Sequence, residues 1–111
     1  MTASELDRRQ YVRAVLDMYL VLPQAPARAR RSDRELAAAL HSQGIPFQIV
    51  RVALLLATAR RLQRPMPLPP VRSLHYFLPA IEEVRQLIPS PSYVHYLELK
   101  IRSFRDNAGA P

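Results

Sequence analysis

Hydrophobic side chains recur along this chain at intervals of three and four residues, the spacing that places them on one face of an α-helix. The first such stretch covers residues 4–22. Its apolar stripe consists of Val12, Val15, Leu16, Tyr19 and Leu22. Ser4 is the predicted N-cap, and Pro23 is the predicted stop because proline cannot continue a helix. We therefore expect an amphipathic helix that packs on the rest of the chain.

A second helix is predicted at residues 32–43. Ser32 is followed three residues later by Glu35, which is the spacing of a capping box at a helix N-terminus. Gly44 comes directly after the helical pattern and is a natural C-terminal cap, because glycine adopts a left-handed backbone at no steric cost.

A third helix is predicted at residues 46–63, which are apolar on nearly every side and are expected to form the centre of the fold. Pro46 suits its first turn, where a missing N–H costs nothing. The segment that follows, "RPMPLPPVR" at residues 64–72, has four prolines in six positions. It is predicted to be an extended strap that lies across the helices.

Two further helical stretches complete the pattern, at residues 73–88 and 92–105, with Ser73 and Ser92 as predicted N-caps. Pro79 lies inside the first of them, so either a kink or a short helix followed by a second start is expected there. No segment of useful length alternates between apolar and polar residues as a half-buried strand would. The sequence thus predicts an all-α fold, a single small bundle of four or five helices with a proline-rich strap.

Length and composition limit the alternatives. A chain of 111 residues suits one domain, residues 1–111, and contains no cysteine for a disulfide, a thiolate metal site or a cysteine nucleophile. The N-terminal sequence "MTASELDRRQYVRAV" has acids and arginines before any apolar run, unlike a secretory signal. The longest apolar run, "VALLLATA" at residues 52–59, is too short to span a membrane. We therefore expect a cytoplasmic protein with no membrane partner.

Charge is distributed unevenly along the chain, which has a net charge of +7. Residues 8–72 contain twelve arginines and three acids, a balance of +9, whereas residues 73–111 are balanced. A regional excess of arginine is typical of a polyanion binder, because guanidinium groups fork onto phosphates and stack on bases. The alternative is an ordinary solvated surface in which a coding bias favours arginine over lysine. That alternative explains the residue type but not the excess of charge.

The arginines concentrate in two parts of the sequence. One is the connector between the first two predicted helices, residues 23–31, together with the first turn of the second helix. The other is the end of the third predicted helix together with the strap. The predicted phosphate contacts are Arg28, Arg30, Arg31, Arg34, Arg60, Arg61, Arg64 and Arg72.

Residues 34–53 also follow the order of a helix-turn-helix, with a glycine between two helical segments. A recognition helix needs a polar face for base edges, but only Gln48 and Arg51 precede the apolar run here. Pro46 occupies the first turn, where base contacts would be made. A helical hairpin of the core is the better interpretation, and sequence-specific readout is kept as an alternative.

No arrangement of residues predicts an enzyme, a metal site, a cofactor or a small-molecule substrate. His41, His75 and His95 are far apart in the sequence and have no acid at ligand spacing. Glu82 and Glu83 are adjacent, so they point to different sides of a helix and cannot act as a general acid and base on one substrate. The two glycines of the chain are isolated, which excludes a glycine-rich phosphate loop.

The run "LHYFLP" at residues 74–79 places His75, Tyr76 and Phe77 next to one another. Exposed rings beside arginines would be stacking platforms for single-stranded nucleic acid. The favoured interpretation is that these rings fill the core around the following proline.

Two runs, "RARRSDRELAAALHSQGIPFQIVRVALLLATARR" and "RSLHYFLPAIEEV", resemble small helical proteins of bacterial mobile elements, and together they cover roughly two fifths of the chain. That group has no established activity to transfer. The order of helix, glycine and apolar helix around Gly44 bears a weaker resemblance to DnaD-type replication initiation and primosomal proteins. This resemblance implies a nucleic-acid setting but supplies no residue-level motif, and the chain departs from those proteins in length and in its proline strap.

The sequence therefore favours a non-enzymatic accessory protein that binds DNA or RNA through phosphate contacts with little sequence preference. It would act as a subunit of a mobile-element, replication or RNA-guided complex, with a protein partner. One alternative is an adaptor whose apolar helices and strap dock a protein. The other is a helix-turn-helix regulator.

Overall fold

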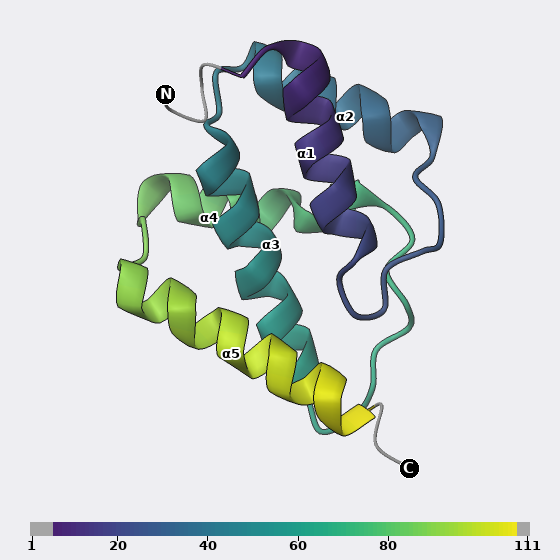
Figure 1. Cartoon of the computed structure of the whole chain (residues 1–111), viewed down its shortest axis with the longest axis vertical. Coiled ribbons are helices and arrows are strands. Elements are labelled where there is room, and N and C mark those ends of the chain that lie inside the picture. The colour runs from purple at the N-terminus through teal and green to yellow at the C-terminus, as the bar shows by residue number, and fades with distance from the viewer. Residues whose placement is uncertain (1–5, 109–111) are drawn as a thin grey trace.

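The structure, a computed structural model, describes residues 6–108, and this part of the chain forms five α-helices and one short 3₁₀ helix with no strand (Figure 1). The elements are α1 (Arg8–Leu20), α2 (Arg31–Ser42), α3 (Phe47–Leu62), η2 (Leu74–Phe77), α4 (Leu78–Gln86) and α5 (Pro91–Ala108). The predicted all-α class is confirmed, and five α-helices agree with the predicted four or five.

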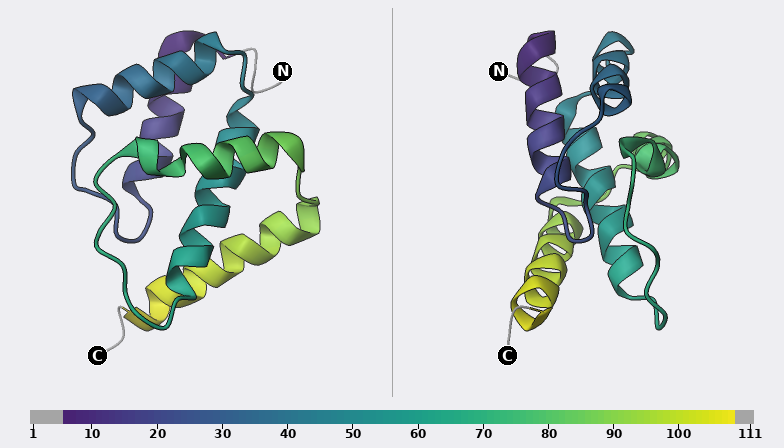
Figure 2. Two further views of the ribbon diagram at one scale, coloured as in Figure 1. Left: turned by 180° about the vertical axis from the view of Figure 1, so that it is seen from behind. Right: turned by 90° about the vertical axis from the view of Figure 1, so that its right-hand side faces the viewer.

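Helix α3 lies at the centre of the molecule. Seen edge-on, α1 and α5 lie on one side of α3, and α4 lies on the other (Figure 2). Nine of its 16 residues are buried, and Val50, Ala53 and Leu54 have no exposed surface at all. A helix that is apolar on nearly every side is stable only when neighbours cover it on every side, and here three other helices do so. The prediction that this segment forms the centre of the fold is confirmed.

Two buried tyrosines of α1 fasten it to the rest of the core. The Tyr11 hydroxyl donates a hydrogen bond to the Ile45 carbonyl oxygen at 2.8 Å, which ties α1 to the turn between α2 and α3. Burial raises the pKa of Tyr11 to about 12. The Tyr19 ring meets Phe77 edge-to-face with 6.0 Å between ring centroids, which ties α1 to η2.

Helix α1 begins four residues later than predicted. Its N-cap is Asp7, whose Oδ1 accepts a hydrogen bond from the Gln10 backbone N–H at 2.8 Å. The Gln10 side chain in turn accepts from the Asp7 backbone N–H at 3.2 Å, which completes a capping box. Ser4, the predicted cap, lies outside the described residues.

The predicted capping box of Ser32 and Glu35 at the start of α2 is wrong. The helix begins at Arg31, and the Asp33 carboxylate accepts from the Arg30 backbone N–H at 2.9 Å. Glu35 instead forms an ion pair with Arg31, with 3.3 Å between Nε and Oε1. An acid three residues after the N-cap does accept from the N-cap backbone N–H, as predicted for a capping box. The N-cap, however, is Arg30, two residues earlier than the predicted Ser32.

The turn between α2 and α3 follows the predicted chemistry at Gly44, which has φ of +74°. The Gly44 N–H donates to the His41 carbonyl and the Ile45 N–H donates to the Leu40 carbonyl, the pair of bonds that defines a Schellman motif. Pro46 is the residue immediately before α3 and not part of its first turn.

The stretch predicted as one helix at residues 73–88 is divided into η2 and α4. Ser73 caps η2 as predicted, because its hydroxyl accepts from the His75 backbone N–H at 3.1 Å. Pro79 lies in the first turn of α4, where proline is tolerated. Of the two possibilities expected at this proline, a kinked helix or a short helix followed by a second one, the structure has the second.

Helix α5 begins at Pro91 and runs to Ala108, three residues past the predicted end. The hydroxyl of Ser90 accepts from the Tyr93 backbone N–H at 3.2 Å. Ser92, the predicted cap, is already inside the helix.

Candidate nucleic-acid interface

A buried aspartate organises the end of the molecule where α2 begins. Asp33 has no exposed surface, and its Oδ2 accepts from the Arg30 backbone N–H at 2.9 Å. Its Oδ1 accepts from the Leu74 backbone N–H at 2.9 Å and from the Ser73 hydroxyl at 3.5 Å. Hydrogen bonds of this kind are what allow a carboxylate to be buried. One side chain thus joins the end of the connector to the end of the strap.

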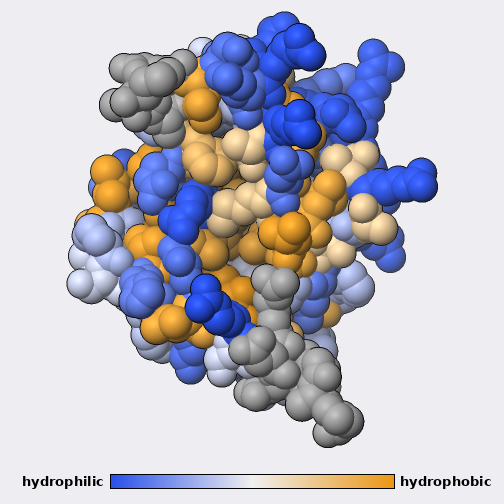
Figure 3. Space-filling view, viewed as in Figure 1, coloured by the Kyte–Doolittle hydropathy of each residue, from blue (hydrophilic) through white to orange (hydrophobic). Residues whose placement is uncertain are grey.

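This junction brings together arginines that are distant in sequence. The Arg30 backbone N–H is hydrogen-bonded to the Asp33 carboxylate. Arg72 immediately precedes Ser73, whose hydroxyl donates to the same carboxylate. Arg28 and Arg34 line one open pocket beside them. Hydrophilic side chains accordingly gather over α2 and the connector, in the upper right of the space-filling view (Figure 3).

The guanidinium groups at this end have few internal partners. Arg28, Arg30, Arg34 and Arg72 are all exposed, and no carboxylate among the described residues lies within ion-pair distance of any of them. The side chain of Arg31 is 92% exposed, and its pairing with a helix neighbour at the surface is of the weak, readily broken kind. We call these five side chains the connector arginines.

The arginines at the end of α3 are engaged differently, beginning with Arg60. Its two terminal nitrogens donate to the two carboxylate oxygens of Glu83 on α4, both at 2.7 Å. The hydrogen bonds from Arg60 lower the pKa of Glu83, and the same bonds raise the pKa of Arg60. Arg60 therefore holds α3 against α4.

Arg61, predicted as a phosphate contact, is 7% exposed and lies inside the fold. It donates twice to the Gln24 side-chain oxygen, at 3.1 and 2.7 Å, and once to the Pro69 carbonyl at 2.6 Å. Its guanidinium carbon lies 5.0 Å from the centre of the Tyr76 ring. Arg61 thus fastens both the connector and the strap to α3, and three of its five N–H donors are used within the protein.

The connector and the strap are also joined backbone to backbone. The Val71 N–H donates to the Gln24 carbonyl at 3.0 Å, and the two segments meet on one side of the molecule (Figure 1). Gln24 has φ of +67°, a conformation that costs a side-chain-bearing residue about 1 kcal/mol or more. The hydrogen bonds from Arg61 and Val71 account for its persistence.

Arg64 is exposed, with no carboxylate within ion-pair distance among the residues described. It lines a second open pocket of about 300 Å³, together with Arg60, Arg61, Tyr76 and Glu83. The eight predicted arginines therefore form two groups. One is the five connector arginines. The other, at the end of α3, consists of Arg60 and Arg61, which are bound to other parts of the protein, and Arg64, which has no such hydrogen bond or ion pair among the described residues.

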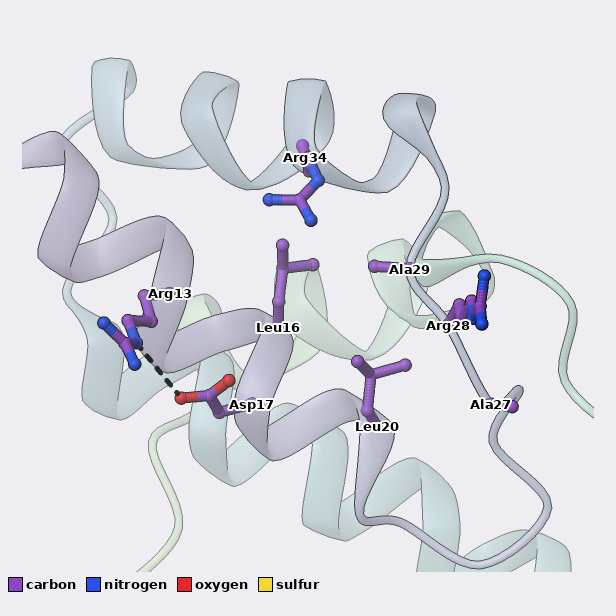
Figure 4. A pocket seen from close by; sticks show the side chains of 8 residues that line it. All are labelled: Arg13, Leu16, Asp17, Leu20, Ala27, Arg28, Ala29 and Arg34. Carbon is purple, nitrogen blue, oxygen red and sulfur yellow. Dashed lines mark ion pairs between the residues drawn. The ribbon is translucent and has the colours of Figure 1, made fainter.

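One arginine that sequence analysis did not select belongs with the connector arginines. Arg13 of α1 lines the same pocket as Arg28 and Arg34 (Figure 4). Its position could have been inferred, because Arg13, Leu16 and Leu20 share one face of a helix that is followed directly by the connector.

The run of aromatic residues at 75–77 contributes one ring to the core. Phe77 is buried, and Tyr76 is 44% exposed with Arg61 over its ring. The prediction that the rings fill the core is therefore correct for Phe77, whereas Tyr76 and His75 are exposed. His41 is half-buried, with Nε2 at 3.0 Å from the Leu6 carbonyl oxygen.

Among the side chains that the structure describes, those of residues 6–104, no group of three or more His, Asp or Glu is placed to hold a metal ion. Of the helices in this part of the chain, none combines the length and the apolar character needed to cross a membrane.

No protein-family profile matches the sequence, and neither a curated protein nor a solved structure matches it.

Proposed function

We propose that this chain is a non-enzymatic nucleic-acid-binding protein that contacts the phosphate backbone through its connector arginines. The observation that carries the proposal is the set of four exposed guanidinium groups, on Arg28, Arg30, Arg34 and Arg72, at one end of the fold with no carboxylate of the described residues in reach. Guanidinium groups that neutralise no internal charge are available to release counterions from a polyanion.

The fold favours contact with phosphates over reading of bases. Helix α3, which would be the recognition helix of a helix-turn-helix, is covered by α1, α5 and α4. The connector arginines instead come from two irregular segments and the first turn of α2, an arrangement that suits contact with phosphates. Binding should therefore depend strongly on salt and weakly on sequence, as suits an accessory subunit of a mobile-element, replication or RNA-guided complex.

The test is titration of labelled single-stranded and double-stranded DNA and RNA at several salt concentrations. If the four exposed connector arginines each replace a condensed counterion, log K should fall against log salt with a slope of about −3 for single strands. A salt-independent affinity, or no binding at low salt, would contradict the proposal.

A second candidate function is an adaptor that docks a protein partner, and it is favoured by apolar side chains exposed where α4 meets α5. Leu87 is 77% exposed and Ile88 is 67% exposed. Near the start of α5, Tyr93 and Tyr96 stack with 5.9 Å between ring centroids, each nearly half exposed. Isolated exposed apolar residues are common, but a group of four is a feature of interaction surfaces.

The two functions are separable because they use different surfaces. Replacing Leu87 and Ile88 by aspartate should abolish a protein complex and leave nucleic-acid binding unchanged if the adaptor function holds. Reversing the charge of Arg28, Arg30 and Arg34 should have the opposite result if nucleic-acid binding holds.

A further inference from the structure

An open pocket of about 510 Å³ lies between α1, the connector and α2. Its basic side chains are Arg13, Arg28 and Arg34, each from a different one of these three segments. In the close view, Arg34 reaches from α2 toward Leu16, and Arg28 lies on the far side of the space (Figure 4). The volume is within the range of about 300 to 1,000 Å³ that small-molecule sites occupy.

Apart from its basic side chains and Asp17, the lining of this pocket is apolar. Leu16 and Leu20 project from α1 into the space below α2, and Ala27 and Ala29 of the connector complete the apolar surface (Figure 4). A phosphate alone needs only the guanidinium groups, because an anion gains nothing from aliphatic contact. The combination instead matches a ligand that has an anionic group attached to a flat or apolar body.

The pocket contains one carboxylate, and it opposes the binding of an anion only weakly. Asp17 pairs with Arg13 at 3.9 Å between Nε and Oδ2, with both side chains more than 70% exposed. An exposed pair at that distance contributes little, so Arg13 can turn toward an incoming phosphate. Arg28 and Arg34 have no carboxylate within ion-pair distance among the described residues.

We propose that this pocket receives one nucleotide of a single-stranded nucleic acid. The phosphate lies among the guanidinium groups of Arg13, Arg28 and Arg34, and the base rests on the aliphatic surface of α1 and the connector. Guanidinium planes also stack on bases, so the same side chains serve both parts of the nucleotide. The inference rests on the proposed function and specifies its ligand, a single strand and not a duplex.

The preference for single strands follows from geometry. In a duplex the bases are stacked and paired inside, and only phosphates and groove edges reach the protein surface. The aliphatic surface of the pocket would then remain uncovered, whereas a single strand can turn a base out of its stack and into the pocket. Burying about 60 Å² of the base against these aliphatic groups corresponds to a roughly tenfold gain in affinity.

The experiment compares a labelled single strand of about 15 nucleotides, as DNA and as RNA, with a hairpin duplex that has the same number of phosphates. The unmodified protein should bind the single strand about ten times more tightly. Ala27→Phe fills the pocket without removing a charge, since Ala27 is exposed and lines it. This variant should lose about tenfold in affinity for the single strand and retain its affinity for the duplex.

The matched control is Ala39→Phe, which adds the same ring at an exposed position of α2 outside the pocket and should bind both ligands like the unmodified protein. A second variant, Asp17→Asn, removes the one carboxylate of the pocket and should raise the affinity for the single strand by a few fold. Circular dichroism of each variant verifies that it is folded.

The outcomes separate the two proposals. Salt-dependent binding that does not distinguish single strands from duplexes, or that Ala27→Phe leaves unchanged, overturns the pocket and leaves the proposed function standing. Absence of binding to every nucleic acid at low salt overturns the proposed function itself. A mononucleotide that binds as tightly as the strand, with the same loss in Ala27→Phe, identifies a free nucleotide as the ligand and overturns the inference.

Discussion

The arginines at the two ends of the molecule differ in what their guanidinium groups contact. At the end of α3, Arg60 is bound to Glu83 of α4, and Arg61 is bound to Gln24 and Pro69. The four connector arginines other than Arg31 have no carboxylate within ion-pair distance among the described residues. The same residue type thus holds the fold together at one end and is left exposed at the other.

The two groups of arginines differ because the nearby carboxylates, Glu83 and Asp33, have different hydrogen-bond partners. Helix α4 directs Glu83 outward to Arg60, so that charge is neutralised on the surface. At the connector the corresponding acid, Asp33, points inward and accepts hydrogen bonds from backbone N–H groups and a hydroxyl. An acid that satisfies the backbone leaves neighbouring guanidinium groups without a counterion. A basic surface therefore results from the placement of one carboxylate as well as from the number of arginines.

The largest expected effect comes from removing that carboxylate. Asp33→Ala leaves the Leu74 N–H buried without an acceptor and detaches the connector from the strap, which should lower the free energy of unfolding by about 3 kcal/mol. Urea denaturation measures the change. Asp17→Ala is the control, because this aspartate is exposed and its loss should cost less than about 0.5 kcal/mol. Equal losses in the two variants would show that Asp33 does not organise this end.

The next effect tests whether the exposed arginines bind the polyanion. Replacing Arg28, Arg30 and Arg34 together by glutamine should weaken binding of a single strand about 100-fold at 0.1 M salt, because each phosphate contact contributes roughly fivefold there through counterion release. The slope of log K against log salt should become shallower by about 2. Fluorescence anisotropy at several salt concentrations measures both quantities.

The control for this triple variant changes the same number of charges elsewhere. Arg85, Lys100 and Arg102 are exposed, lie outside the predicted phosphate contacts, and can also be replaced together by glutamine. Net charge falls by three in both triple variants, so a purely non-specific attraction would weaken binding equally in the two. A connector-specific site requires a clearly smaller loss in the control.

The helices were predictable from the sequence because periodicity and proline placement determine them locally, but their N-termini were less so. At α2 the sequence offers two acids, Asp33 and Glu35, either of which can cap if the start shifts. The choice of Asp33 depends on its bonds to Ser73 and Leu74, about 40 residues away, which no local pattern contains. Tertiary contacts decided the register.

The site was predictable as a region but not residue by residue. Arg60 and Arg61 are adjacent and chemically identical, yet a helix turns about 100° per residue, so they face different surroundings. Their partners, Glu83 and Gln24, come from other parts of the chain. Sequence composition thus identified where arginines gather, and only the fold shows which of them have donors to spare.

The contrast between neighbours at the end of α3 leads to a third prediction. Arg61→Ala removes three hydrogen bonds from a buried position and should lower the free energy of unfolding by about 2 kcal/mol. The Val71 N–H, which bonds to Gln24, should exchange faster with solvent because Arg61 no longer holds the two segments in place. Arg64→Ala, three residues on and exposed, should change neither quantity measurably. If Val71 exchanges at the same rate in both variants, Arg61 does not fasten the strap.

The smallest effect concerns the exposed pair at the same end. The hydrogen bonds from Arg60 hold the pKa of Glu83 below its ordinary value. Because the folded pKa is the lower one, the pair stabilises the fold at all pH values above about 4.3, and that contribution is lost as the pH falls through the lowered folded pKa. A carbon-13 NMR titration of the Glu83 carboxyl group should therefore shift upward in Arg60→Gln. It should stay in place in Arg85→Gln, since Arg85 pairs with Glu82. An unchanged Glu83 titration in Arg60→Gln would contradict the pairing.

Glu83, with its lowered pKa, is charged throughout the neutral pH range in which nucleic acids are normally bound. Arg60 therefore stays bound to Glu83 at these pH values, and the contrast between Arg60 and the connector arginines does not depend on pH within that range.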